Sequence, residues 1–131
     1  MFIGNWLLAL SWDCAFAIEH VYGHHKNVCL PSDPATAKRG ENIYAFILRA
    51  ISKEQKDAWN IELIRLRKND YNLIRIHNRM ILGYLRSIVI TIISYLIGGL
   101  IGMLFYLLCA FIGKSLLEVI NYTEHLSLIH I

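Results

Sequence analysis

Residues 87–113 read SIVITIISYLIGGLIGMLFYLLCAFIG and contain no charged side chain. The apolar run extends from Ile81 to Ile120, where only Arg86, Lys114 and Glu118 are charged. A helix that crosses the hydrocarbon of a bilayer needs about 20 apolar residues, so one straight helix of this length would overshoot the membrane. We predict a transmembrane hairpin over residues 81–121 that breaks at Gly98-Gly99, with crossings from about Tyr84 to Ile97 and from Leu100 to Ile120.

The composition of the whole chain also indicates a membrane protein. Hydrophobic residues make up 56% of the 131 residues, and the mean hydropathy is +0.43. The apolar stretch 1–18 has no basic start and no small-residue cleavage site, so it is not typical of a secretory signal. We interpret residues 1–25 as the end of a membrane helix that carries a histidine cluster. Asp13 interrupts the apolar stretch and is expected to face protein or a polar cavity.

The basic residues are concentrated in the middle of the chain. Twelve of the thirteen Lys and Arg lie between Lys26 and Arg86, together with six acidic residues. Basic loops beside membrane helices face the cytoplasm, so we predict that residues 26–80 form a cytoplasmic amphipathic segment. Its basic residues alternate with acids on helical faces instead of clustering, and we therefore expect no nucleic acid partner.

Helical patterns divide this cytoplasmic segment. Proline ends a helix, so the first helix is expected to stop near Pro31, and Asp33-Pro34 has the residue types of a new helix start. Apolar residues at helical spacing then predict one amphipathic helix over residues 43–51 and a second over residues 53–69. The predicted fold class is all-α: a fragment of an integral-membrane helical bundle with a cytoplasmic amphipathic-helix insertion.

Several other polar residues were considered as functional candidates. Lys114 and Glu118 are four positions apart in the apolar run, a spacing that permits an ion pair; structural and functional roles weigh equally for them. His77 lies in a basic segment and is expected to be solvated. The three cysteines are odd in number and form no CxxC pattern, which favours neither disulfides nor zinc: Cys14, Cys29 and Cys109.

Three histidines within six positions, in the stretch EHVYGHH (19–25), call for a chemical explanation. In an α-helix His20 and His24 share one face, whereas His25 is turned about 100° further round, so the trio can serve two adjacent metal positions. Neutral imidazole suits iron, zinc, copper and nickel alike. Glu19 and Glu124 neighbour histidines in the sequence, and carboxylates often hold the second ring nitrogen of a metal-bound imidazole. We predict a metal site in which these two glutamates hydrogen-bond to the ligand histidines.

Four short motifs resemble one known family. EHVYGHH (19–25), DPATA (33–37) and GENIYAF (40–46) are similar to the EHxxGHH region of bacterial membrane alkane 1-monooxygenases and the related xylene monooxygenases. NYTEH (121–125) resembles the start of their NYxEHYG motif. The motifs stand in the family's order and extend over most of the chain.

The resemblance implies a nonhaem diiron site whose ligands include His20, His24, His25 and His125. It further implies an enzyme that uses O₂ to hydroxylate alkanes at a terminal methyl group, or alkyl-aromatics. The electrons would come from rubredoxin, or from a ferredoxin-type donor and its reductase. The implied location is the bacterial inner membrane, where the protein is multi-pass and contacts lipid and a hydrophobic substrate. A fatty-acid desaturase or lipid hydroxylase of the same superfamily is the alternative.

Topology agrees with this grouping of histidines. A single membrane crossing between His25 and His125 would place them on opposite sides, whereas the two crossings of a hairpin return His125 to the cytoplasmic side. The hairpin predicted from hydropathy is therefore the arrangement that a shared site requires.

The family's upstream HExxHK-type and downstream QRHSDHH-type motifs do not occur in the sequence. We therefore expect residues 1–125 to be a fragment of a desaturase-like membrane diiron domain, inactive alone. The final residues 126–131 read LSLIHI, which one reading of a transposon mosaic end used in sequencing libraries would encode. We expect this tail to be adapter-derived and do not count His130 as a ligand.

Overall fold

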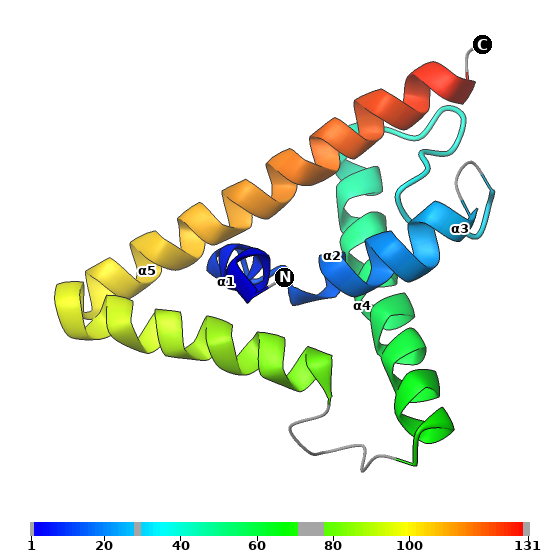
Figure 1. The fold of residues 1–131 in the computed structure, drawn as a ribbon. Coiled ribbons are helices and arrows are strands. Elements are labelled where there is room, and N and C mark those ends of the chain that lie inside the picture. The colour runs from blue at the N-terminus through cyan, green and yellow to red at the C-terminus, as the bar shows by residue number, and fades with distance from the viewer. Residues whose placement is uncertain (1, 28–29, 71–77, 130–131) are drawn as a thin grey trace.

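The computed structural model describes residues 2–27, 30–70 and 78–129, with side chains as far as Glu124. The described part contains helices and no strand, which confirms the predicted all-α fold. The elements in chain order are α1 (Phe2–Leu10), α2 (Cys14–Glu19), the π-helix η1 (His20–His24), α3 (His25–Asn27), α4 (Ile43–Lys68) and α5 (Arg79–Ile129). Figure 1 shows α5 as two arms that meet at a corner, with α1 between the arms and α4 across their open end.

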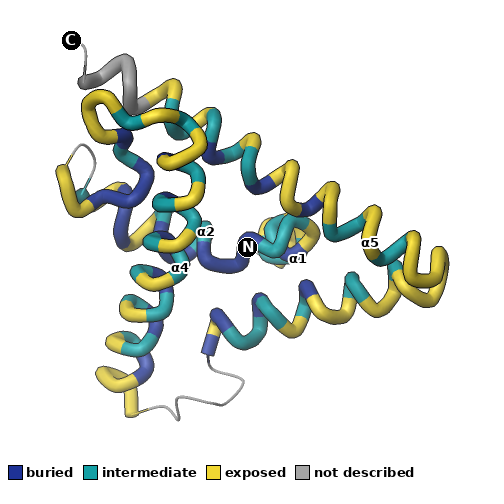
Figure 2. Tube along the Cα trace, turned by 180° about the vertical axis from the view of Figure 1, so that it is seen from behind, coloured by how far each residue is buried: buried dark blue, intermediate teal, exposed yellow. Residues whose placement is uncertain are grey.

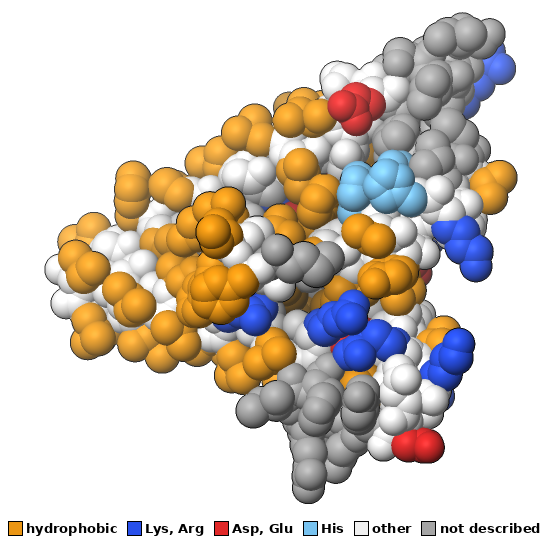
Figure 3. All heavy atoms as spheres, in the orientation of Figure 1, with side chains coloured by type: hydrophobic (Ala, Val, Ile, Leu, Met, Phe, Trp, Pro, Cys, Tyr) orange, Lys and Arg blue, Asp and Glu red, His pale blue; other side chains and the backbone are white. Residues whose placement is uncertain are grey.

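The corner of α5 lies at Gly99, whose backbone has φ 61° and ψ −155°. This combination is accessible to glycine and strained for other residues, so the helix breaks where the sequence predicted. Apolar side chains around the corner are exposed, with Ile97 and Ile101 exposing 83% and 82% of their surface; Figure 3 shows hydrophobic side chains covering this end of the molecule. By length and composition, Arg79–Glu124 is a candidate membrane span. The number of crossings stays a prediction.

The histidine-bearing helix is separate from α1, so the prediction of one continuous helix over residues 1–25 is wrong. The chain turns at Ser11–Asp13, where Trp12 adopts a left-handed φ of 56°. The end of α1 is held by both arms of α5: Ser87 Oγ and Tyr106 Oη both donate hydrogen bonds to the Ala9 carbonyl, at 3.0 and 3.4 Å. Asp13 is fully buried, as its place in an apolar stretch predicted.

α4 is one helix of 26 residues, and the prediction of two helices over 43–51 and 53–69 is wrong. Neither glycine nor proline interrupts this stretch, so the two amphipathic patterns continue as one helix. Asn42 caps it by accepting a hydrogen bond from the Ala45 amide at 2.8 Å. One side of α4 is buried (Figure 2), and its buried residues recur every fourth position: Phe46, Ala50, Glu54, Ala58, Glu62 and Leu66.

The segment between α3 and α4 consists of turns, and the predicted helix start at Asp33-Pro34 is wrong. The Asp33 carboxylate instead closes a turn by accepting from the Ala35 amide at 3.2 Å and from Thr36 Oγ1 at 2.5 Å. Arg49 of α4 holds this segment by donating to Glu41 Oε1 at 2.7 Å and to the Thr36 carbonyl at 3.0 Å. The turns therefore have fixed positions against α4.

Small side chains let α2 cross close to α4. Ala15 and Ala58 are fully buried in one core cluster with Ile18 and Met80. A second cluster joins Phe46 to Tyr122, whose rings are 5.2 Å apart between centroids. Together the two clusters hold the histidine helix, α4 and the C-terminal arm of α5 against one another.

Candidate metal centre

The three histidines of EHVYGHH lie together on a π-helical turn. The ring centroids are 5.2 Å apart for His20 and His24, 4.6 Å for His20 and His25, and 5.9 Å for His24 and His25. The His25 amide donates to the His20 carbonyl, the five-residue spacing of a π-helix. The α-helical geometry assumed for these histidines is therefore wrong, and the π-turn brings the His25 ring at least as close to His20 as the His24 ring. π-Turns inside α-helices occur frequently at functional sites.

The side chain of Glu19 folds under this turn. A Cβ added at Gly23 would lie 2.5 Å from Glu19 Oε1, so the glycine provides the space that the carboxylate occupies. Glu19 is 2% exposed, and no hydrogen-bond partner reaches its Oε1 among the described residues. Burial, and then the neighbouring Asp33 carboxylate, raise the pKa of Glu19 to about 7.

Asp33 is the carboxylate that holds a histidine of the cluster. Its Oδ2 lies 2.9 Å from His24 Nδ1, and both residues are buried. Because Nδ1 of His24 hydrogen-bonds to Asp33, a metal ion would bind the other ring nitrogen, Nε2. Carboxylates in this position fix the tautomer and orientation of metal-binding imidazoles. The sequence reasoning missed this role, although Asp33 stands only nine positions after His24.

The environment keeps His20 neutral. Burial lowers its pKa, the adjacent His24 and His25 lower it further, and the Asp33 and Glu124 carboxylates act in the opposite direction. Neutral imidazole is the form that binds metal ions. Glu124, near the end of α5, is thus close enough to act on the pKa of His20. Glu124 itself is exposed, and the side chains of His125 and His130, like the whole of His77 and Cys29, lie outside the described residues.

Comparison with known proteins identifies the family. A sequence model described as fatty acid desaturase matches residues 1–128. The chain belongs to the fatty acid desaturase family. Similar proteins are named as monooxygenases of alkanes or of xylene and toluene, and three of them show the range of similarity.

Alkane 1-monooxygenase 1 of Pseudomonas aeruginosa is 38% identical over 125 residues, which cover 95% of the chain and 33% of the relative. Alkane 1-monooxygenase of Acinetobacter baylyi is 39% identical over 114 residues, 86% of the chain and 28% of the relative. The xylene/toluene monooxygenase hydroxylase component XylM of Pseudomonas putida is 30% identical over 113 residues, 86% of the chain and 30% of the relative. The chain thus spans about a third of the length of these relatives.

The histidine cluster of this fatty acid desaturase family member has the donor type of a metal site but not its geometry. In the part of the chain that the structure describes, no three His, Cys, Asp or Glu side chains are arranged to hold a metal ion. His20 and His24 stack with an interplanar angle of 22°, so their rings face one another instead of converging on a point. The donor chemistry fits, because neutral imidazoles suit iron and His24 already has its supporting carboxylate.

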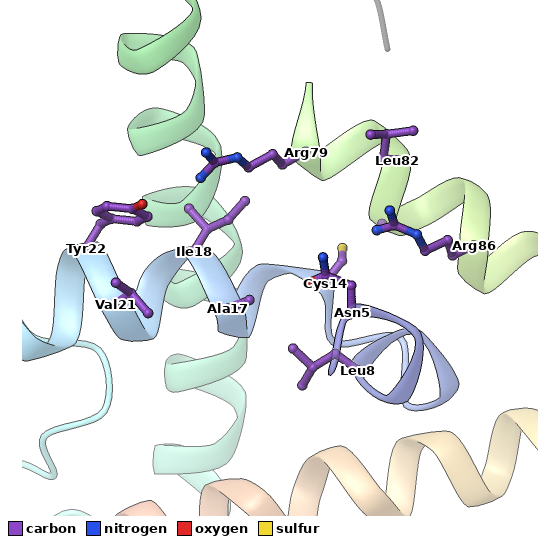
Figure 4. Close-up of a pocket in the computed structure, with 11 residues that line it drawn as sticks. Asn5, Leu8, Cys14, Ala17, Ile18, Val21, Tyr22, Arg79, Leu82 and Arg86 are labelled. Atoms are coloured by element: carbon purple, nitrogen blue, oxygen red, sulfur yellow. The ribbon is translucent and has the colours of Figure 1, made fainter. Parts of the chain in front are cut away.

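An apolar pocket of about 220 Å³ lies beside the histidine turn, between α1, α2 and the start of α5 (Figure 4). Val21 and Tyr22 of η1 belong to its wall, so the pocket borders the turn that carries the histidines. Arg79 and Arg86 contribute its basic side. The remaining lining residues are Asn5, Leu8, Cys14, Ala17, Ile18, Leu82 and Gly83.

Proposed function

We propose that the full-length protein is a membrane-bound nonhaem diiron monooxygenase that hydroxylates alkanes or alkyl-aromatics, with His20, His24, His25 and His125 among its iron ligands. The main observation in support of this proposal is the π-turn, which brings three histidines together, one of them hydrogen-bonded to buried Asp33. The names of the relatives support the reaction class. Glu19 and Glu124 remain proposed supporting carboxylates, and Asp33 joins them.

The described residues have distinct tasks in this proposal. Asp33 holds Nδ1 of His24, so that a metal ion would bind Nε2, and burial lowers the pKa of His20 toward the neutral form that binds metal. Activation of O₂ for insertion of one oxygen atom into a C–H bond is the chemistry that such a centre supplies when bound. The pocket beside Val21 and Tyr22 offers a hydrocarbon chain a largely apolar site next to the histidine turn.

The fold at Gly99 supports the proposed topology. Two membrane crossings, one in each arm of α5, would return His125 to the side of the membrane that carries His20, His24 and His25. The basic segment 26–80 favours the cytoplasmic face of a bacterial inner membrane for this side. Rubredoxin, or a ferredoxin-type donor with its reductase, is the proposed electron source. We propose that the 131-residue chain alone is inactive because its ligand set is incomplete.

Product analysis tests the reaction directly. The full-length protein, supplied with an electron donor and O₂, is offered an alkane, a xylene and an acyl lipid in parallel. We expect a terminal alcohol from the alkane or a benzylic alcohol from the xylene, and loss of product in His24→Ala. An acyl lipid as the sole substrate converted would favour the alternative, a fatty-acid desaturase or lipid hydroxylase, and contradict the proposal.

A further inference from the structure

Four charged side chains meet in the interior, away from the histidines. Asp13, Glu54, Lys114 and Glu118 come from the start of α2, from α4 and from the second arm of α5, and are 0%, 4%, 7% and 1% exposed. Lys114 Nζ is 2.5 Å from Asp13 Oδ1 and 3.8 Å from Glu54 Oε2. The sequence spacing permitted an ion pair between Lys114 and Glu118. The carboxylates paired with Lys114 belong instead to Asp13, at the start of α2, and to Glu54 of α4.

The charges of this buried cluster do not balance. One ammonium faces three carboxylates, so full ionisation would leave two negative charges in excess in a dry interior. An uncompensated buried carboxylate is costly and takes up a proton instead. Asp13 has the direct ion pair with Lys114, whereas Glu54 and Glu118 line one small cavity together. Two carboxyl groups that face one another in a buried site can share a hydrogen bond only if one of them carries a proton.

A small cavity adjoins this carboxyl pair. Its volume is about 10 Å³, and Glu19, Glu54, Glu118 and Asn121 supply its polar lining. Glu54 Oε2 and Glu19 Oε1 are buried and have no hydrogen-bond partner among the described residues. A single water needs a cavity of at least about 10 Å³ and two to four polar partners. The cavity therefore has the size and the unpaired acceptors for one water molecule.

We propose that Glu54 and Glu118 share one exchangeable proton, and that the cavity beside them holds one water through which this proton reaches the histidine turn. The cavity connects the pair to Glu19, the residue before His20. The other ionisable groups facing Glu54 are Asp13 and Glu19 from α2 and Lys114 from α5. The delivery of the proton to the histidine turn rests on the proposed function, whereas the sharing of the proton does not.

The proposed hydroxylation needs such a proton source. Each turnover follows R–H + O₂ + 2 e⁻ + 2 H⁺ → R–OH + H₂O, with the electrons supplied by the donor protein. In each transfer the carboxyl O–H bond breaks and an O–H bond forms on the cavity water, which releases another of its protons toward the histidine turn. The carboxylate left behind regains a proton from solvent.

Electrostatics agrees with a proton held at neutral pH. Burial, and then the negative charge of Asp13, raise the pKa of Glu54 to about 9. Glu62 provides a matched contrast on the same buried side of α4. Burial is the largest single influence and acts to raise its pKa as well, but the hydrogen bonds and positive charges of Arg65 and Arg79 together outweigh it, and the pKa of Glu62 is lowered. One buried glutamate of α4 is thus a proton holder and the other an ionised partner of arginine.

Infrared spectroscopy of the full-length protein tests the shared proton. We expect the carbonyl stretch of a protonated carboxylic acid at about pH 8, above the pKa of about 7 of Glu19 and below the pKa of about 9 of Glu54. This band should shift in D₂O and be lost in both Glu54→Gln and Glu118→Gln. Glu62→Gln is the control and is expected to retain the band. Absence of the band in the wild type, or its survival in Glu54→Gln, would overturn the proposal regardless of any activity.

Turnover tests the delivery. We expect Glu54→Gln to lower the hydroxylation rate at least about 10-fold and to change the solvent isotope effect, with unaltered iron content and partial rescue by Glu54→Asp. An unchanged rate and isotope effect would overturn delivery to the histidine turn. A wild-type protein that shows the infrared band but hydroxylates no hydrocarbon would contradict the proposed function and, with it, the delivery step.

Discussion

Asp33→Asn is the substitution that most specifically disturbs the histidine turn. The amide has the shape of the carboxylate and can still accept from the Ala35 amide, but its NH₂ group would donate to His24 Nδ1, 2.9 Å away. His24 would then accept at Nδ1 and carry its proton on Nε2, the nitrogen needed for a metal ion. Loss of such a carboxylate typically weakens metal binding about 10- to 100-fold, which corresponds to roughly 1.4–2.8 kcal/mol.

The assay is iron retention by full-length protein during dialysis against a graded series of chelator concentrations. We expect Asp33→Asn to lose iron at about 10- to 100-fold lower chelator activity than the wild type, with a similar far-ultraviolet circular dichroism spectrum. Asp57→Asn, on the half-buried side of α4, is the control for a change of charge near the site. Equal iron retention in Asp33→Asn and the wild type would refute the role assigned to Asp33.

Three further predictions concern other parts of the described structure. Gly23→Ala places a Cβ 2.5 Å from Glu19 Oε1, and the displaced carboxylate should lower iron content; normal iron content would contradict the need for this glycine. Lys114→Met leaves the Asp13 carboxylate buried without its partner and should destabilise the protein by about 3–5 kcal/mol. Thermal unfolding in detergent measures this loss, and adding Asp13→Asn should restore part of the stability. An unchanged melting temperature would refute the ion pair. Ala17→Phe narrows the pocket of about 220 Å³ and should shorten the longest alkane hydroxylated, whereas an unchanged product range would exclude this pocket as the substrate route.

Features that depend on local sequence were predicted correctly. The break of α5 falls at Gly98-Gly99 because the combination of φ 61° and ψ −155° found at Gly99 is essentially restricted to glycine. The burial of Asp13 followed from its isolation in an apolar stretch. The three histidines were recognised as a group because they lie within six positions of one another.

Other features depend on geometry that helical periodicity does not encode. The π-turn moves His25 beside His20 through a five-residue hydrogen bond, whereas α-helical spacing directs it elsewhere. In the sequence, Asp33 has the residue type and position of a helix cap. Its contact with His24 depends instead on the path of the turns between α3 and α4. The pairing of Lys114 with Asp13 joins residues 101 positions apart, and only the packing of α5 on α2 brings them together.

The central claim is that the π-turn of residues 20–24 and His25 hold iron in the full-length protein. Mössbauer spectroscopy of the purified protein, combined with iron analysis, tests it most directly. We expect two iron ions per chain in an imidazole-rich environment, with the signal lost or strongly altered in His24→Ala and retained in the exposed-site control Lys56→Ala. Iron that stays unchanged in number and spectrum when His20, His24 and His25 are all replaced by alanine would contradict the claim.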